Sequence, residues 1–205
     1  MSHESWVLPV VMEGKRVRLE PLSIVHAVKL ARIADDDLFR FFAGFRPQGR
    51  DAKAGEEFIR NVNAQANKVS FAIIDKTTKQ PVGATSFMDI RDKHRGLEIG
   101  STWLAPAAQG TAVNPESKLL MLTHAFETLG AIRVQFRTDT RNLQSQRAIE
   151  KLGATRDGIF RQDCIMPDGF IRDSVFYSIV PEEWPAVKTK LMARLAAFGG
   201  PERIE

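Results

Sequence analysis

Leu97-Glu98-Ile99-Gly100-Ser101-Thr102-Trp103-Leu104 is the stretch that decides the fold, because it reads as an apolar strand that leads into a small-residue turn. The turn is Gln109-Gly110-Thr111-Ala112-Val113-Asn114, and a helix is predicted to open at Pro115 directly after it. The first N–H groups of a helix have no partner within the helix, so such a turn attracts phosphate. We therefore expect an anion site beside a strand edge, an arrangement that suits a cofactor with a pyrophosphate.

Three further elements follow the turn. Apolar residues recur at spacings of three and four along an amphipathic helix that Asn114 would cap and Gly130 would end: Leu119, Leu122, Phe126 and Leu129. Residues 132–137 alternate between apolar and polar and predict a strand. Asn142 is predicted to cap a second helix that runs to Leu152 and is closed by Gly153.

The flanking regions show simpler patterns. Strands are predicted over residues 15–22, 69–75 and 81–90, and together with residues 97–104 the last two form an antiparallel meander. Helices are predicted over residues 24–34, with Ile24, Val28, Leu30 and Ile33 facing inward, over 51–66, and over 182–198 at the end of the chain. Pro167-Asp168-Gly169 predicts the turn of a late hairpin. Four phenylalanines would pack in the core or line a substrate pocket: Phe39, Phe41, Phe42 and Phe45.

Composition predicts one globular domain over residues 1–205, since 43% of the residues are hydrophobic and 26% are charged. The 29 basic and 25 acidic residues leave a net charge of +4, which could favour anionic ligands such as nucleotides. This balance is too weak and too scattered to predict binding to DNA or RNA. A solvated surface of mixed charge is the simpler interpretation.

The expected compartment is the cytoplasm. Cys164 is the single cysteine, so no internal disulfide forms, which fits a reducing environment. No stretch approaches the roughly 20 apolar residues that span a bilayer, and residues 1–9 lack the pattern of a leader peptide. We expect no metal site, because the histidines are widely separated: His3, His26, His94 and His124.

Several short motifs occur in a family's order: Glu98-Ile99-Gly100, Trp103-Leu104, Pro106, Gln109-Gly110, Asn142 with Ser145, and Glu150-Lys151-Leu152-Gly153. With them the chain resembles the GNAT superfamily of N-acetyltransferases, nearest to the Rim-type branch that modifies the N-termini of ribosomal proteins. The resemblance implies an α/β (α+β) fold whose helices flank a mixed, mostly antiparallel sheet of about seven strands, splayed between the fourth and fifth.

The resemblance also implies acetyl-coenzyme A as co-substrate. Its pantetheine arm resembles a peptide strand and would pair with the backbone of Thr102, Trp103 and Leu104. Its pyrophosphate would lie on the loop residues Gln109, Gly110, Thr111, Ala112, Val113 and Asn114, although the family pattern has Gly in place of Ala112 and Gly or Ala in place of Asn114. Asn142 and Ser145 would add contacts. Arg147 would contact the phosphate or adenosine end, or be a surface charge beside Glu150.

The implied reaction is direct transfer of the acetyl group from sulfur to a primary amine. Glu98 is the first candidate for the base, the alternative being a structural carboxylate paired with an arginine such as Arg137. Asp163 is the second candidate. Ser145 is the candidate acid for the leaving thiolate, the alternative being a serine that bonds to the helix backbone. Ile149 stands where many relatives carry a tyrosine for this role, and Arg137 where another branch carries a glutamate.

An acetyl-CoA-dependent N-acetyltransferase is therefore the leading hypothesis. The acceptor would be a protein N-terminus or a small-molecule amine, in a pocket formed by residues 35–60 and the hairpin near residues 163–172. Because the tyrosine is missing and the loop is altered, the alternative is a non-catalytic coenzyme A-binding sensor or interaction module. Edge strands and the C-terminal helix offer surfaces on which a homodimer could form. Nucleic acid and membrane partners are not expected.

Overall fold

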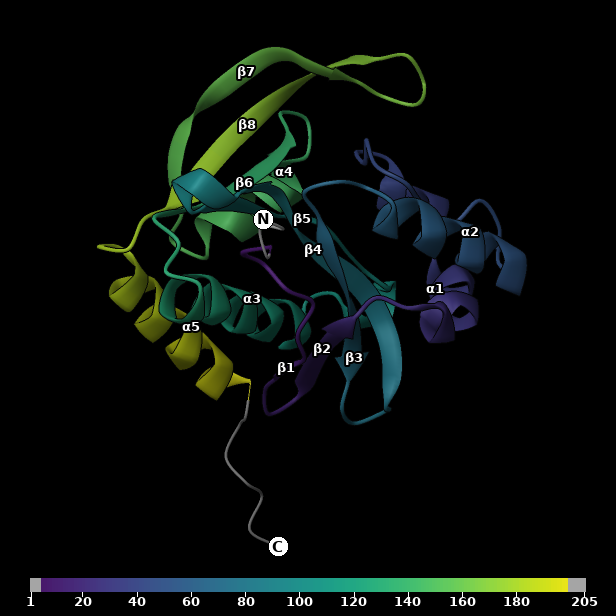
Figure 1. Ribbon diagram of the computed structural model, residues 1–205, viewed down its shortest axis with the longest axis horizontal. Helices are drawn as coiled ribbons and strands as arrows, with labels where there is room; N and C mark the ends of the chain where they lie inside the picture. The colour runs from purple at the N-terminus through teal and green to yellow at the C-terminus, as the bar shows by residue number, and fades with distance from the viewer. Residues whose placement is uncertain (1–4, 199–205) are drawn as a thin grey trace, which may run out of the picture.

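The computed structural model describes residues 5–198, which form an eight-stranded sheet with helices packed against it (Figure 1). The strands are β1 (Met12–Glu13), β2 (Val17–Pro21), β3 (Val69–Asp75), β4 (Gln80–Arg91), β5 (Gly96–Leu104), β6 (Arg133–Asp139), β7 (Thr155–Ile165) and β8 (Ile171–Ile179). The α-helices are α1 (Ala27–Ile33), α2 (Ala52–Asn63), α3 (Val113–Thr123), α4 (Leu143–Glu150) and α5 (Trp184–Ala197). A π-helical turn, His124–Thr128, prolongs α3.

The strands lie in the order β1-β2-β3-β4-β5-β6-β8-β7, and every neighbouring pair is antiparallel except β5–β6. This confirms the predicted mixed, mostly antiparallel sheet. The strand count of about seven was one too low, because Met12 and Glu13 pair with β2 as an extra edge strand. Two residues are too few to leave an alternating pattern in the sequence.

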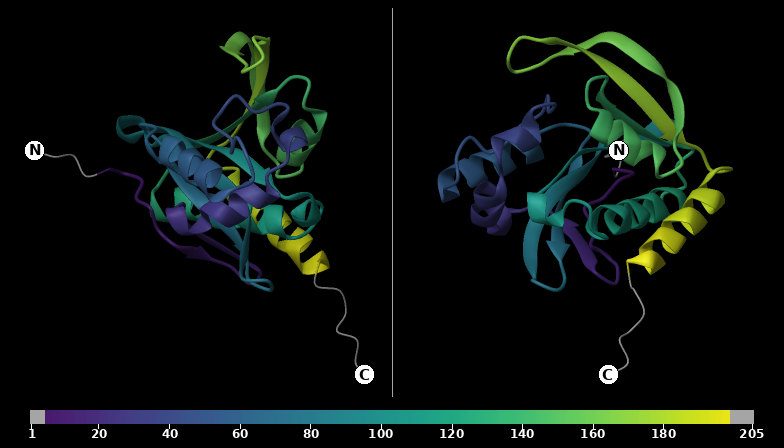
Figure 2. Two further views of the ribbon diagram at one scale, coloured as in Figure 1. Left: turned by 90° about the vertical axis from the view of Figure 1, so that its right-hand side faces the viewer. Right: turned by 180° about the vertical axis from the view of Figure 1, so that it is seen from behind.

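The helices cover both faces of the sheet. α1 and α2 pack on one face, and α3 and α5 lie on the other (Figures 1 and 2). The β7–β8 hairpin arches away from the far end of the sheet (Figure 1). None of the helices within residues 5–198 is both long and apolar enough to cross a bilayer.

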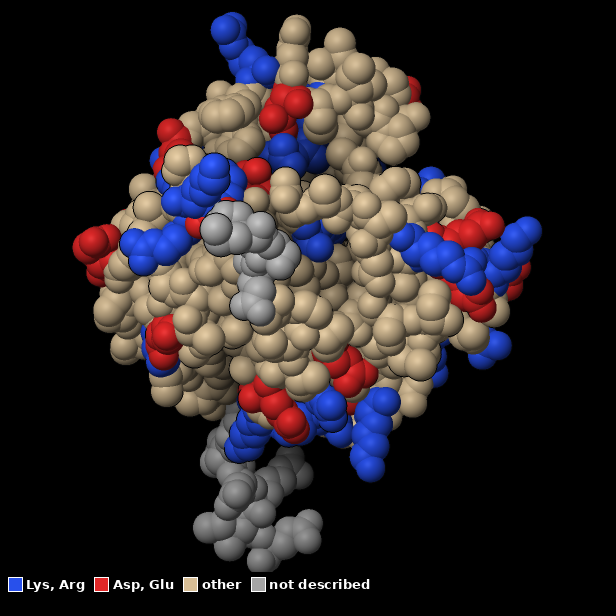
Figure 3. Space-filling view, in the orientation of Figure 1, with Lys and Arg blue, Asp and Glu red and all other residues tan. Residues whose placement is uncertain are grey.

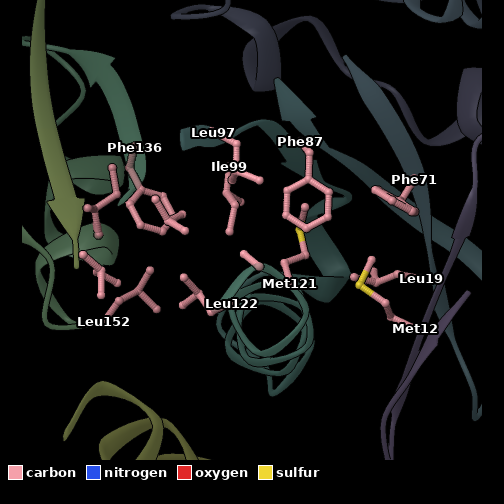
Figure 4. Packing of buried hydrophobic residues seen from close by; sticks show 14 of the residues in the cluster. Met12, Leu19, Phe71, Phe87, Leu97, Ile99, Met121, Leu122, Phe136 and Leu152 are labelled. Carbon is pink, nitrogen blue, oxygen red and sulfur yellow. The ribbon is translucent and has the colours of Figure 1, made fainter. Parts of the chain in front are cut away.

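The larger core lies between α3 and the sheet. Met121 and Leu122 of α3 point toward apolar side chains of the strands, among them Phe87 and Leu97 (Figure 4). Met121, Leu122, Phe87 and Leu97 are all fully buried. This packing fixes α3 beneath the middle of the sheet, so it also fixes the loop that enters α3.

Two predicted details of the helices were wrong. α3 begins at Val113 and not at Pro115, because Ala112 already has a helical backbone and takes the N-cap position in place of Asn114. The side chain of Ala112 cannot cap the helix. The hydroxyl of Thr111 accepts a hydrogen bond from the N–H of Val113 at 3.2 Å instead. Pro115 falls in the first turn, where its missing N–H costs nothing.

The inward face of α1 also differs from the prediction. Ile24, which lies in a preceding 3₁₀ turn, and Val28 are 44% and 40% exposed, whereas Leu30 is buried as predicted. Ala27 faces the core instead, because α2 packs directly on it. A Cβ on Gly55 of α2 would lie 2.2 Å from the backbone carbonyl oxygen of Ala27, so this close approach requires glycine on α2.

Replacing Met121 with alanine should lower the free energy of unfolding by about 2–5 kcal/mol, because it leaves a cavity in the core between α3 and the sheet. The matched control is Met192→Ala on α5, whose side chain is 54% exposed and should change stability by less than about 0.5 kcal/mol. Urea denaturation measures both. Equal effects of the two substitutions would contradict the described position of α3.

Candidate functional site

A fork in the sheet is the main feature of the site. β5 and β6 pair at only three positions, Gly96↔Arg133, Leu97↔Val134 and Glu98↔Gln135. Beyond Glu98 the strands separate, so the backbone groups of β5 that face β6 have no strand partner there. Such an exposed edge can accept an extended ligand. The fork confirms the predicted splay, since β5 and β6 are the fourth and fifth of the predicted strands.

A bulge in β5 lies just beyond the fork. The register between β4 and β5 shifts by one residue between Ala84↔Trp103 and Ser86↔Gly100, and Ser101 has a left-handed backbone with φ 48°. A bulge re-aims the side chains that follow it. As a result Ser101 and Trp103 share the side of α1 and α2 with Glu98. Thr102, in contrast, faces α3 with Leu97 and Ile99.

The loop between β5 and α3 presents free N–H groups. Gly110 has φ 72°, a conformation that favours glycine. Among the described residues, no hydrogen bond uses the N–H groups of Gly110, Thr111 or Ala112. The Gln109 side chain donates to the carbonyl of Leu104 at 3.1 Å and so ties the loop to the end of β5. The loop therefore has the free N–H donors predicted for an anion site.

Arg137 brings the two candidate carboxylates together. Its Nη1 donates to Asp163 Oδ2 at 3.1 Å, and its Nε lies 3.7 Å from Glu98 Oε2. Gln135 Nε2 also donates to Glu98 Oε2 at 3.1 Å. Glu98 is only 3% exposed, so its carboxylate faces a largely dry, polar cluster.

The two oxygens of Glu98 have different surroundings. Both Gln135 and Arg137 approach Oε2, whereas Oε1 lies over Gly100: a Cβ placed there would be 2.8 Å from Oε1. Burial raises the pKa of Glu98, although the charge of Arg137 and the hydrogen bond from Gln135 oppose the rise. A raised carboxyl pKa is a property that a general base requires near neutral pH.

A narrow pocket lies on the same face of β5 as Glu98, toward α1 and α2. Aromatic side chains form much of its wall: Phe42, Phe45, Phe58 and Trp103. Lys68 supplies the polar end, where its Nζ donates to Ser101 Oγ at 3.2 Å. Burial lowers the pKa of Lys68 to about 8, against the opposing charge of Glu98. Within the phenylalanine cluster, Phe39 packs in the core against Trp103, whereas Phe42 and Phe45 line this pocket; a substrate there stays a prediction.

The β7–β8 hairpin meets the loop before α2 above this pocket. Arg172 Nη1 donates to the carbonyl of Phe41 at 3.4 Å, and the guanidinium of Arg141 lies 3.6 Å from the centre of the Phe170 ring. Residues 35–60 and the hairpin near residues 163–172 therefore do come together, as predicted for the acceptor side. Basic and acidic side chains are intermixed on the face seen in Figure 3, without one dominant sign.

α4 begins beside the fork. Asn142 caps it as predicted, since its Oδ1 accepts a hydrogen bond from the N–H of Ser145 at 3.0 Å. Ser145 is half-buried and Arg147 is exposed. Glu150 accepts a hydrogen bond from the Tyr177 hydroxyl at 3.0 Å. Tyr177 is buried in the α3-side core, and burial raises its pKa to about 12, so it is poorly suited to replace the missing tyrosine.

Two lysines near the fork were missed at the level of sequence, Lys68 and Lys118. The sequence did contain a sign that Lys118 is buried. It lies three residues before Met121 and four before Leu122, both buried, and so shares their face of α3. The sequence contains no such sign for Lys68, because Lys68 precedes β3 in a polar loop. Within residues 5–198, no three His, Cys, Asp or Glu side chains are grouped as metal ligands.

Comparison with known proteins matches the profile of the Acetyltransferase (GNAT) domain to residues 16–155. A proposed ribosomal N-acetyltransferase, YdaF of Bacillus subtilis (strain 168), is 29% identical over 106 residues, 52% of this chain and 57% of that protein. The match thus spans little more than half of that relative's length.

Solved structures share the architecture. A proposed acetyltransferase from T. thermophilus superposes with a TM-score of 0.85 at 40% identity, over 93% of this chain and 99% of that chain. RimJ of Mycobacterium smegmatis, solved in complex with CoA-disulfide, has a TM-score of 0.75 at 20% identity over 91% and 95% of the two chains, which shows the common fold. Because the family profile covers most of the chain, and the forked sheet agrees with it, this protein belongs to the GNAT family of acetyltransferases.

Proposed function

We propose that this protein transfers the acetyl group of acetyl-coenzyme A to a primary amine by direct attack. The acceptor is a protein N-terminus or a small-molecule amine. The observation that carries the proposal is the fork between β5 and β6 beyond Glu98, which lies beside a loop of free N–H groups and a buried carboxylate. Membership of the acetyltransferase family supports it.

The residues at the fork fit coenzyme A. The amide-bearing pantetheine arm would lie along the free edge of β5 at Thr102 and Trp103, while the carbonyl of Leu104 is already engaged by Gln109. The pyrophosphate would lie on the loop and the start of α3, residues Gln109, Gly110, Thr111, Ala112, Val113 and Asn114. The N–H groups of Gly110, Thr111 and Ala112 are the ones without a partner among the described residues. The first turns of α4 would supply further contacts from Asn142, Ser145 and Arg147. When bound, the coenzyme supplies an acetyl group activated as a thioester.

Glu98 would act as the base. Its Oε1 is the oxygen left free by Gln135 and Arg137, and it lies on the face of β5 that also carries the aromatic pocket. Asp163 would serve chiefly to hold Arg137, since their side chains are hydrogen-bonded at 3.1 Å. An α-amine with a pKa near 8 is about one-tenth neutral at pH 7, so a modest base suffices for it.

Protonation of the leaving group would require little help. A thiol has a pKa of about 8.5, so a thiolate leaves without strong acid catalysis. Ser145 would be the nearest match to the family's acid. The capping hydrogen bond at α4 uses only the backbone N–H of Ser145, so its hydroxyl is left for the cofactor. Ile149 occupies the position where a tyrosine would serve in many relatives.

Replacing Gly110 with valine should weaken binding of acetyl-coenzyme A at least tenfold, because a β-branched residue strains a backbone at φ 72° and displaces the N–H groups of the loop. Gly169→Val is the matched control, since Gly169 has φ 83° and lies in the distant hairpin turn, and a Cβ added at either glycine would meet no atom within 4 Å. Calorimetric titration measures both. Equal affinities of the two variants would contradict the assignment of the loop.

Incubation with acetyl-coenzyme A and a panel of amines, with thiol release and product mass as readouts, tests the function itself. The panel contains peptides with free N-termini, amino acids, polyamines and aminoglycosides. We expect turnover that falls as the pH drops through the raised pKa of Glu98, because the base must be ionised. Glu98→Gln should lower kcat/KM about 10²–10⁴-fold and remove this dependence, while the titration of the amine remains.

The controls separate the two candidate functions. Coenzyme A should bind the Glu98→Gln variant as tightly as the wild type. Coenzyme A binding by the wild type without turnover of any amine would favour the non-catalytic sensor or interaction module. A Glu98→Gln variant with unchanged kcat/KM at every pH would show that Glu98 is the structural partner of Arg137 and Gln135.

A further inference from the structure

Lys118 is a buried lysine without a carboxylate partner. It is 6% exposed, and its Nζ donates one hydrogen bond, to Thr102 Oγ1 at 2.7 Å. Among the described residues it takes part in no ion pair. An ammonium has three N–H donors, so two of them find no acceptor in the described protein. An apolar side chain such as methionine would fill this space without the cost of desolvating a charge, so packing alone does not account for the amine.

The position of this pair relates it to the fork. Thr102 lies in β5 just beyond the Ser101 bulge and past the last residue paired with β6, and its hydroxyl faces α3. Lys118 lies in the second turn of α3, directly after the loop of free N–H groups. Both side chains thus lie on the α3 face of β5, beyond the point where β6 stops pairing with it. Thr85 Oγ1 lies 2.8 Å from Thr102 Oγ1 and fixes the hydroxyl from the β4 side.

No charged group of the surrounding elements faces Lys118. Glu116, on the same helix, accepts the backbone N–H groups of Lys15 and Arg16 in the β1–β2 turn, each at 2.9 Å. Glu127 of the π turn pairs with Lys188 of α5 at 2.8 Å.

The other titratable side chains on the elements around Lys118 pair with partners of their own or are uncharged. In the β1 and β2 layer, Glu13 pairs with Lys76, and Glu20 pairs with Arg18 and His26. Burial lowers the pKa of His124 below its ordinary value, so this side chain is neutral near pH 7. Burial alone therefore lowers the pKa of Lys118, to about 7, and about half of the molecules carry the charge at neutral pH.

We propose that Lys118 and Thr102 form a buried donor pair, in which the Lys118 amine donates and the Thr102 hydroxyl positions it, and that the amine binds an acceptor atom of coenzyme A in the opening between β5 and β6. The inference rests on the proposed function, because it requires coenzyme A at the fork. A bound acceptor stabilises the charged amine, so coenzyme A binding draws a proton onto Lys118 Nζ. Binding and proton uptake are therefore linked through this residue.

Isothermal titration of coenzyme A at pH 7, repeated in buffers of different ionisation enthalpy, measures affinity and proton uptake together. Lys118→Met should take up fewer protons than the wild type on binding and bind coenzyme A about tenfold more weakly. The control is Lys188→Met, which removes a half-exposed lysine of α5 that pairs with Glu127, away from the fork, and should bind like the wild type.

Thermal unfolding of the free variants completes the test. Lys118→Met should unfold at the wild-type temperature or above it, because the substitution removes a buried unpaired amine. Thr102→Val keeps the lysine but removes the hydroxyl that positions it, and should weaken coenzyme A binding several-fold. If Lys118→Met does not fold, the binding measurement on Thr102→Val tests the inference instead.

The outcomes distinguish the inference from the proposed function. Wild-type affinity and proton uptake in both Lys118→Met and Thr102→Val would overturn the donor pair while leaving the fork as the cofactor site. Absence of coenzyme A binding by the wild type would overturn the proposed function and the inference together.

Discussion

The hydrogen-bonded ladder between β5 and β6 ends at Glu98 and Gln135, and the geometry of the site follows from this early end. A strand that loses its neighbour must find other partners for its backbone groups or leave them to solvent or a ligand. The side chains of the last pair hydrogen-bond to each other at 3.1 Å and close the fork with polar groups. Beneath it, Met121 and Leu122 hold α3 against the sheet, so the loop that precedes α3 is fixed beside the open strand edge.

The bulge at Ser101 determines which residues of β5 face each side of the sheet. On the side of α1 and α2 it places Ser101 with Lys68 and the aromatic pocket, where the free oxygen of Glu98 also lies. On the side of α3 it places Thr102 with Lys118. In the proposed reaction the amine would approach from the first side, and the coenzyme would lie in the fork against the second. Without the bulge, Glu98 and Trp103 would point to opposite faces of β5.

The sequence patterns predicted the features that depend on local order. Apolar runs bounded by polar turns predicted β3, β4 and β5 closely, the late hairpin followed from its turn residues, and Asn142 was identified as a cap. The resemblance to a family supplied the fork. Features set by tertiary packing were not predicted: the start of α3 at Val113, the bulge at Ser101, and the meeting of Glu98 with Asp163 through Arg137. These residues are far apart in the chain or depend on register, which periodicity does not encode.

Hydrogen exchange of the backbone amides, followed with and without coenzyme A, tests most directly whether the open edge of β5 binds the cofactor. The account predicts slower exchange for the amides near Thr102 and Trp103 and for the loop at Gly110, with no change in the fully paired strands β2 and β3. Protection confined to other parts of the chain, with β5 and the loop unchanged in the presence of bound coenzyme A, would contradict it.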